Sequence, residues 1–228
     1  MTPRDSNISS NGLETLAIDV WSDVVCPWCY IGKRRLEAAL ERFPRRDLVT
    51  VTWRSYQLDP SAPRIPVETT RAMLARKYGV PLEQADAMQV RVTGVAAQEG
   101  LRYKLEATRH ESSFDAHRLL HLAKQHGVQD ELKERLFSAH FCEGLSISDH
   151  AELVRLATSI GLAAPDINRV LGGTEFADEV RADIEQARAL GIQGVPFFVI
   201  AGRYGVSGAQ SAEVLLQAME EAGKEALG

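Results

Sequence analysis

The sequence has few cysteines, no long apolar run and no large excess of either charge. Three cysteines in 228 residues cannot form the disulfide framework of a small secreted domain. No apolar stretch approaches the roughly 20 residues that span a bilayer, so we expect no membrane contact. Residues 1–14 lack the apolar core of a signal peptide, so we expect a disordered tail and a cytoplasmic protein. The net charge of −5 gives no reason to expect a nucleic-acid partner.

The remaining composition is that of an ordinary globular chain, with 45% apolar and 25% charged residues. The length allows one large domain or two smaller ones. The sequence has neither a P-loop nor a dinucleotide fingerprint, so nothing in it points to a nucleotide cofactor.

The most informative segment is a CxxC motif between a strand pattern and a helical pattern. Cys26 and Cys29 enclose Pro27 and Trp28. The strand pattern is Leu16, Ile18 and Val20; the helical pattern is Ile31, Leu36, Ala39, Leu40 and Phe43, ended by Pro44. We therefore expect Cys26 at a helix N-terminus, where free N–H groups and the helix dipole stabilise a thiolate and lower the pKa of Cys26. Such a junction is typical of a redox dithiol.

Two other interpretations of the motif are weaker. Tetrahedral zinc needs about four ligands. The only further cysteine is Cys142, and there is no second CxxC and no HxxxH, so we expect no metal site. An inert structural pair is disfavoured because a cytosolic CxxC is more often catalytic than structural. We expect no cofactor beyond the redox-active Cys26–Cys29 disulfide, with glutathione as a candidate co-substrate. Cys142 itself is interpreted as a packed free thiol.

The rest of the chain divides into mixed ends and a helical middle. Alternation predicts a strand over 48–56, and three prolines within 60–66 mark a boundary. Val195–Ile200 and 204–206 predict a hairpin. Ser207 and Gln210 have capping-box spacing and predict the start of a final helix. Helices are expected over 67–78, 81–99, 113–126, around 132–137, around 153–160, and over 174–190, the last capped by Thr174.

This order of elements is β–α–β, a helical block, then β–β–α. Two strands alone do not make a stable sheet, so the two ends should share one sheet. We expect an α/β protein with residues 15–63 and 189–228 in one discontinuous domain. Residues 64–188 should form an all-helical insertion that covers one side of the dithiol and lines a groove beside Trp28.

The order and motifs resemble a thioredoxin fold with the large helical insertion of the DsbA-like branch. Residues 23–37, 191–198 and 207–210 look like the FrnE-type group of that branch. The resemblance implies a thiol–disulfide oxidoreductase or isomerase acting on thiol- or disulfide-bearing proteins or small molecules. It implies that Cys26 is the nucleophile, that Cys29 resolves the mixed disulfide, and that Val195–Pro196 is a cis peptide beside them. Pro27, Trp28, Val195 and Pro196 are then candidate substrate-binding residues. Monomer and homodimer both stay open.

Two other functions are considered. Kappa-class glutathione transferases look similar in architecture but place serine where this chain has Cys26. Glutathione could then be held by the Val195–Pro196 backbone and by a helix N-terminus at Ser207, Gly208, Ala209 and Gln210. A binding module with an incidental CxxC is disfavoured most.

Trp28 carries no charge, and Lys33, Arg34 and Arg35 are expected to be solvated, so the lowering of the Cys26 pKa should be moderate.

Overall fold

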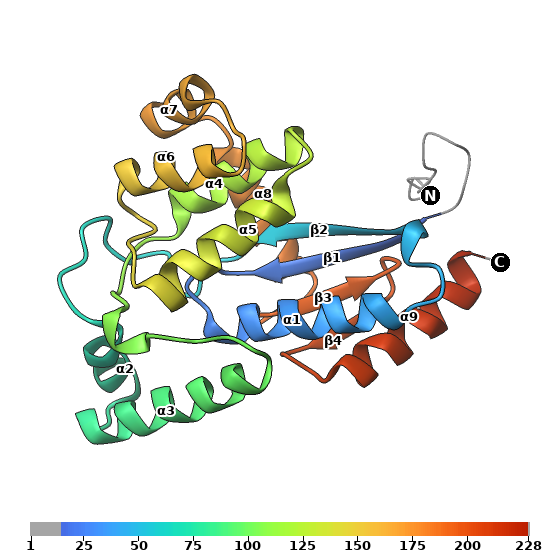
Figure 1. Cartoon of the computed structure of the whole chain (residues 1–228), viewed down its shortest axis with the longest axis horizontal. Coiled ribbons are helices and arrows are strands. Elements are labelled where there is room, and N and C mark those ends of the chain that lie inside the picture. Colours follow the sequence, from blue (N-terminus) through green and yellow to red (C-terminus); the bar gives the residue numbers. More distant parts are fainter. Residues whose placement is uncertain (1–14, 228) are drawn as a thin grey trace.

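The computed structural model describes residues 15–227, and these form one four-stranded sheet flanked by helices (Figure 1). The strands are β1 (Leu16–Ser22), β2 (Val49–Ser55), β3 (Phe197–Ile200) and β4 (Tyr204–Ser207). Their order is β2-β1-β3-β4. β1 is parallel to β2 and antiparallel to β3, and β3 and β4 form an antiparallel hairpin. Both ends of the chain therefore build one sheet, as predicted.

Helices α1 and α9 come from the two ends of the chain, and α2 to α8 lie between β2 and β3 in sequence. Their bounds are α1 (Pro27–Arg42), α2 (Thr70–Tyr78), α3 (Leu82–Gln98), α4 (Phe114–Gln125), α5 (Gln129–Phe137), α6 (His150–Ser159), α7 (Ala164–Gly172), α8 (Ala177–Ala189) and α9 (Ala212–Ala226). A π-helical turn, η3 (Ser138–Glu143), follows α5. Within residues 15–227, no helix combines the length and the apolar character of a membrane span.

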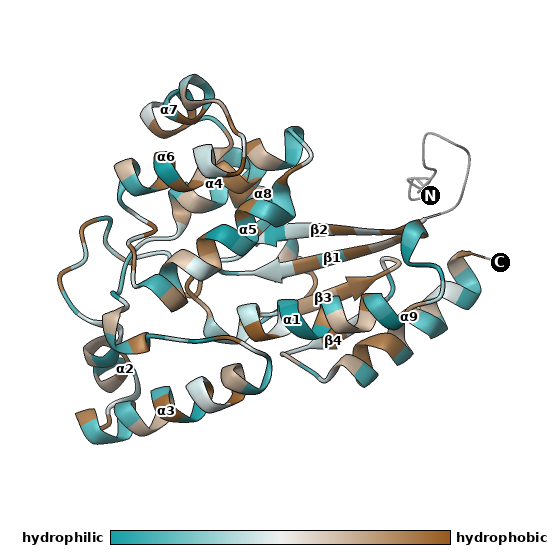
Figure 2. Cartoon of the chain, in the orientation of Figure 1, coloured by the Kyte–Doolittle hydropathy of each residue, from teal (hydrophilic) through white to brown (hydrophobic). Residues whose placement is uncertain are grey.

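One face of the sheet packs against α1 and α9. Alternate residues of β1 (Leu16, Ile18, Val20) are fully buried there with Leu36 of α1 and Met219 of α9. In Figure 2, β3 is brown along its length, whereas α1 and α9 alternate between brown and teal. This pattern is expected for a buried strand and for amphipathic helices that cover it.

The opposite face of the sheet holds α8. Trp21 of β1 packs with Ala187 and Ile192, and its indole Nε1–H donates to the carbonyl of Asp183 at 2.9 Å. The Asp183 carboxylate accepts from the backbone N–H of Ser55 at 2.8 Å. These contacts tie the last helix of the insertion to β1, which precedes the CxxC motif, and to β2, which follows α1.

The helices of the insertion fall into two groups in Figure 1. Helices α4 to α8 lie above the sheet, and α2 and α3 lie to its lower left. The first group has its own apolar core, which includes Leu119, Leu136, Leu156 and Ile167. Val24, next to the CxxC motif, belongs to the same core. The division into residues 15–63 with 189–228 and an insertion over 64–188 stays a prediction, and the tail expected over 1–14 lies outside the described residues.

Three helix starts differ from the sequence prediction. The helix expected from residue 67 begins at Thr70, because Thr69 Oγ1 accepts from Ala72 N–H and caps it. The helix expected from Thr174 begins at Ala177. The final helix begins at Ala212, where Ser211 Oγ accepts from Val214 N–H, and not at the capping box of Ser207. Ser207 is instead paired with Phe197 in the hairpin.

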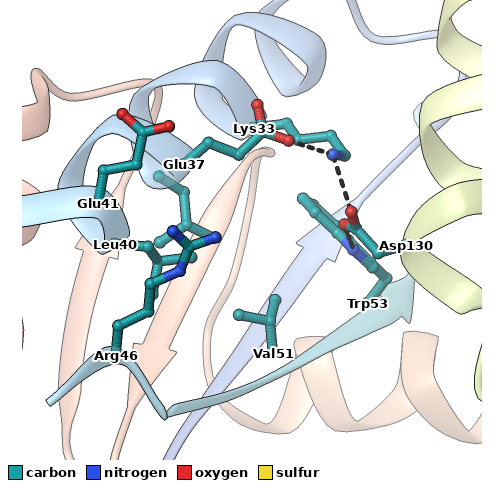
Figure 3. Close-up of a pocket in the computed structure, with 9 residues that line it drawn as sticks. Lys33, Glu37, Leu40, Glu41, Arg46, Val51, Trp53 and Asp130 are labelled. Carbon is teal, nitrogen blue, oxygen red and sulfur yellow. Dashed lines mark hydrogen bonds and ion pairs between the residues drawn. The ribbon is translucent and has the colours of Figure 1, made fainter.

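The basic run after the motif is not solvated, contrary to the prediction. Lys33 is buried at the side of α1 and pairs with Glu37, with Asp130 at 3.1 Å and with Glu134 at 3.3 Å. Figure 3 shows Lys33 reaching from α1 toward Asp130, which also accepts from Trp53 Nε1–H at 2.8 Å. This cluster joins α1, β2 and α5 along a cavity of about 320 Å³ that the cysteines do not line.

Candidate active site

The CxxC motif lies at the junction between β1 and α1. Cys26 is the N-cap of α1 and Pro27 is its first helical residue. Proline suits that position because its missing N–H would have no partner and its φ is already helical. The Cys26 N–H donates to Asp23 O at 3.1 Å, and the Cys29 N–H donates to Cys26 O at 3.0 Å. The motif therefore occupies the cap and the first helical turn, as the sequence predicts.

The two thiols differ in accessibility and face the loop before β3. Cys26 is 4% exposed and Cys29 is fully buried, and both are free thiols. Cys26 Sγ lies 3.5 Å from the carbonyl oxygen of Val195 and donates to it. The Val195–Pro196 bond is cis, as the resemblance implies. A Cβ added to Gly32 would lie 2.8 Å from Pro196 Cγ, so glycine at position 32 permits this close approach.

The dipeptide between the cysteines is held by an aromatic cluster. Tyr103 Oη donates to Pro27 O at 2.7 Å. Its ring packs against Tyr30 and Phe141, with centroids 6.1 and 5.0 Å away. Trp28 remains 39% exposed. Trp28 is therefore an apolar surface next to Cys26 that a substrate can contact.

A buried carboxylate and imidazole lie directly before the motif. Asp23 Oδ1 lies 3.3 Å from His117 Nε2, and Asp23 Oδ2 accepts from the Leu58 N–H at 2.8 Å. Burial raises the pKa of Asp23, but the bonds from His117 and Leu58 outweigh it, so the pKa lies below its usual range. Burial lowers the pKa of His117, against the attraction of Asp23. At neutral pH the pair is a carboxylate and a neutral imidazole.

A buried lysine from the insertion lies beside the same segment. Lys133 of α5 is fully buried, and its Nζ donates to Ser22 O at 3.4 Å. Its ammonium also lies over the rings of Trp53 and Phe137, at 5.5 and 4.8 Å from their centroids. Among the described residues it makes no ion pair. Burial lowers the pKa of Lys133 to about 8, although the nearby Cys29 and Asp23 favour its charged form.

Within the dithiol, the pKa of Cys26 is raised and the pKa of Cys29 is lowered. The hydrogen bond to Cys29, together with burial, raises the pKa of Cys26. Burial also raises the pKa of Cys29, but the bond from Cys26 and the charge of Lys133 outweigh it and lower this pKa. The prediction that Cys26 carries the lowered pKa is therefore wrong for this geometry. The main reason is the hydrogen bond between the two thiols, which favours the thiolate on Cys29, and the charge of Lys133 adds to it.

A cavity of about 570 Å³ opens beside the dithiol. Val25, Cys26, Pro27, Trp28, Gly194 and Val195 form one side of it. The other side comes from the insertion and from the loop before α2, including Leu58, Met73, Met88, Leu105 and Phe141. The volume falls within the range of about 300–1,000 Å³ that is usual for small-molecule sites.

The structure brings Cys26, Cys29 and Val195 together and places the candidate glutathione-binding segment next to them. The Gly208 N–H donates to Pro196 O at 2.8 Å, and Arg35 donates to Ala209 O at 2.5 Å. Gln210 Nε2 donates to Ser207 O at 2.9 Å. Residues 207–210 form the turn before α9, and none of the four lines the cavity. The helix N-terminus expected there starts four residues later.

The sequence interpretation missed the buried polar residues of the insertion. Lys133 lies one helical turn before Phe137, so it shares the buried side of α5. From the sequence alone, a lysine at this position could equally lie at the edge of the buried side, with its ammonium in solvent. His117 falls within the helical pattern over 113–126 and was interpreted as a packing or surface residue, and Glu111 and His140 gave no signal. Cys142 is half-buried against the aromatic cluster, in agreement with a packed free thiol. Within residues 15–227, no group of histidine, cysteine and acidic side chains could hold a metal.

Comparisons with known proteins agree with this geometry. A family model, "DSBA-like thioredoxin domain", matches residues 17–220. The crystal structure of a probable DsbA oxidoreductase from Streptomyces coelicolor is similar, with 46% identity, a TM-score of 0.88, and coverage of 92% of this chain and 91% of that one. The uncharacterised protein YwbO of Bacillus subtilis is 28% identical over 223 residues, which are 92% of this chain and 99% of the relative.

A more distant structure shares the fold alone. The cytosolic disulfide reductase DsbM from Pseudomonas aeruginosa, solved with GSH, is 15% identical, covers 92% of this chain and 96% of its own, and has a TM-score of 0.62. Together these comparisons confirm the expected α/β class, a thioredoxin fold with a large helical insertion of the DsbA-like type. Assignment to the FrnE-type group stays a prediction.

Proposed function

Because the chain belongs to the family of DSBA-like thioredoxin domains, we propose that it is a thiol–disulfide oxidoreductase whose redox group is the Cys26–Cys29 dithiol. One observation carries the proposal: the only near-surface sulfur of the pair, Cys26, caps α1 and lies 3.5 Å from Val195 O. A thiolate at a helix start is the usual attacking group in such enzymes.

The proposed reaction proceeds through a mixed disulfide. Transfer of the shared proton to Cys29 leaves Cys26 as the thiolate, which attacks one sulfur of the substrate disulfide and releases the other as a thiolate. Cys29 then passes its proton to the released substrate thiolate and attacks Cys26 Sγ, and the second substrate sulfur leaves as a thiolate that takes a proton from solvent. The protein dithiol becomes a disulfide, and one substrate disulfide becomes two thiols. The reverse sequence oxidises a substrate dithiol, and both in succession isomerise disulfides.

The charges around Cys29 support its role as the resolving thiol. The bond from Cys26 and the charge of Lys133 favour a thiolate on the buried sulfur without exposing it to solvent. Pro27, Trp28, Val195 and Pro196 are the proposed substrate contacts: Trp28 offers an exposed ring, and the backbone beside Pro196 can pair with an extended substrate segment. The enzyme needs no metal in this scheme. A cytoplasmic location stays a prediction.

The test is insulin disulfide reduction with dithiothreitol as the source of electrons. We expect Cys26→Ser to abolish activity and Cys29→Ser to accumulate mixed disulfides that non-reducing gels resolve. Cys142→Ser is the matched control, because it removes the third thiol outside the motif, and it should keep wild-type activity. Wild-type activity in Cys26→Ser would refute the assignment.

A glutathione-dependent transferase or isomerase is the second candidate, because the cavity beside Cys26 has the size of a small-molecule site. In this case glutathione would be the co-substrate and would extend from the cavity past Pro196 toward Ser207, Gly208, Ala209 and Gln210, which do not line the cavity themselves. Conjugation of glutathione to chlorodinitrobenzene distinguishes the two functions. A transferase keeps this activity in Cys26→Ser, whereas an oxidoreductase shows none.

A further inference from the structure

We propose that the cavity beside the dithiol selects small thiols or disulfides that join an apolar body to a negatively charged group. The inference rests on the proposed redox function and adds a substrate class to it. Three features of the cavity support the proposal: its size, its apolar lining and its unpaired cations.

The size and lining of the cavity fit the apolar body. Its volume of about 570 Å³ would hold a compound of one or two rings against the sulfur of Cys26. The surface around it is contributed mainly by large apolar side chains: Leu58, Met73, Leu74, Met88, Val92, Leu105 and Phe141. Trp28 adds an exposed aromatic face at the side where the reacting sulfur lies.

The cations of the cavity are unpaired, unlike most arginines of the described chain. Lys77 of α2, Arg91 of α3 and Arg109 before α4 all line it. None of the three has a carboxylate within ion-pair distance among residues 15–227. These side chains are exposed in the empty cavity, so an anionic ligand would gain their attraction without breaking an existing pair.

The two carboxylates of the cavity are held by hydrogen bonds within the protein and are outnumbered by its three cations. Asp59 accepts from Ser61 and lies 2.9 Å from His110 Nε2. Glu111 accepts from the hydroxyl of Ser148 at 2.7 Å and from the Ile147 N–H at 3.2 Å, and a further bond from Ser146 Oγ holds it. The free charge that remains toward a ligand is therefore positive.

A buried imidazole forms part of the cavity wall. His140 lines the cavity and is 2% exposed. Its Nδ1 lies 3.3 Å from Glu111 Oε1 but has no hydrogen-bond partner of acceptable geometry among the described residues. The imidazole therefore adds a neighbour to Glu111 and no free cation to the cavity.

Two aromatic disulfides that differ in charge test the proposal. Dithiobis(nitrobenzoate) carries a carboxylate on each ring, and dithiodipyridine is neutral. With either one, the protein dithiol becomes a disulfide and the reagent becomes two thiols, so electrons balance without a further reactant. The rate constants are measured in a Cys142→Ser background, so that the thiol outside the motif does not contribute.

The cavity variant is Arg91→Gln with Arg109→Gln. The matched control is Arg155→Gln with Arg188→Gln, which removes two exposed arginines that lie outside the cavity and pair with Glu152 and Glu185. We expect the cavity variant to lose about tenfold in kcat/KM for the carboxylate disulfide, which corresponds to about 1.4 kcal/mol, and less than about twofold for the neutral one. The control should change neither rate. Equal losses for both disulfides, or no loss, would overturn the proposal.

Failure of the cavity proposal and failure of the redox function have different signatures. A protein that reduces insulin but shows no charge preference refutes the cavity proposal alone. If insulin and both disulfides are inert, the redox function fails, and the cavity is then judged by equilibrium binding of anilinonaphthalene sulfonate, an apolar anion. The cavity variant should weaken that binding by about tenfold relative to the control variant; an unchanged Kd would refute the cavity proposal.

Discussion

Replacing Lys133 by methionine should make the protein more stable and slow its reduction of insulin. The side chain is fully buried, and its pKa is lowered from 10.5 to about 8 mainly by that burial. The difference is 2.5 units, and each unit corresponds to about 1.4 kcal/mol, so holding the ammonium in the folded protein costs about 3 kcal/mol at neutral pH. Methionine has a similar length and no charge, so Lys133→Met should recover most of this cost.

The pH dependence identifies the cause of the gain. Below about pH 8 both the folded and the unfolded lysine are protonated, and the full cost is present. Between about pH 8 and pH 10.5 the unfolded state binds more protons than the folded state, so wild-type stability rises with pH in that window. The advantage of Lys133→Met should therefore fall from about 3 kcal/mol at about pH 7 to about 1 kcal/mol at about pH 9.5.

Urea denaturation of the reduced proteins measures this difference. Lys224→Met is the matched control, because Lys224 is an exposed lysine of α9 paired with Glu221, and its loss should change stability by less than about 0.5 kcal/mol. Lys133→Met should also raise the pKa of Cys29 and slow insulin reduction at neutral pH. A variant that is less stable than wild type at neutral pH, or a gain that does not change with pH, would contradict the reasoning.

The remaining predictions concern backbone packing and acid stability. Gly32→Ala should destabilise the protein by about 1–3 kcal/mol and slow insulin reduction, because its Cβ would meet Pro196 at 2.8 Å. Gly94 also lies within a helix, but a Cβ added there has no neighbour within 4 Å, so Gly94→Ala should instead stabilise the protein by up to about 1 kcal/mol. Similar effects of the two glycine variants in urea denaturation would refute the packing argument. His117→Gln should remove part of the stability loss on acidification below about pH 6.5. Because the pKa of His117 is lowered in the folded protein, the unfolded state takes up a proton first, and stability falls as the pH falls. Equal acid sensitivity of His117→Gln and wild type would show that the buried pair with Asp23 is not the cause.

Local signals predicted the fold and the position of the dithiol because they depend on short stretches of chain. Alternation at Leu16, Ile18 and Val20, and proline directly after Cys26, fix a strand and a helix start that the structure reproduces. The final helix was misplaced for a local reason as well. Ser207 and Ser211 are both good caps, and only the pairing of Ser207 with Phe197 in the hairpin decides between them.

The electrostatics of the site could not be predicted in the same way, because they arise from contacts over long sequence separations. Lys133 reaches Ser22 across 111 positions, and His117 reaches Asp23 across 94. Nothing in the sequence near residue 133 shows that the helix will place an ammonium beside Cys29. The assignment of the lowered pKa to Cys26 therefore followed from the helix N-terminus alone.

The redox equilibrium of the dithiol with glutathione tests the central claim most directly. The protein is equilibrated with mixtures of reduced and oxidised glutathione, trapped with acid and an alkylating reagent, and the peptide that contains Cys26 and Cys29 is examined by mass spectrometry. The account predicts an intramolecular disulfide, two hydrogens lighter than the dithiol, whose fraction follows the ratio of oxidised glutathione to the square of reduced glutathione. A dithiol that persists at every ratio, or glutathione attached to Cys26 without the intramolecular disulfide, would contradict it.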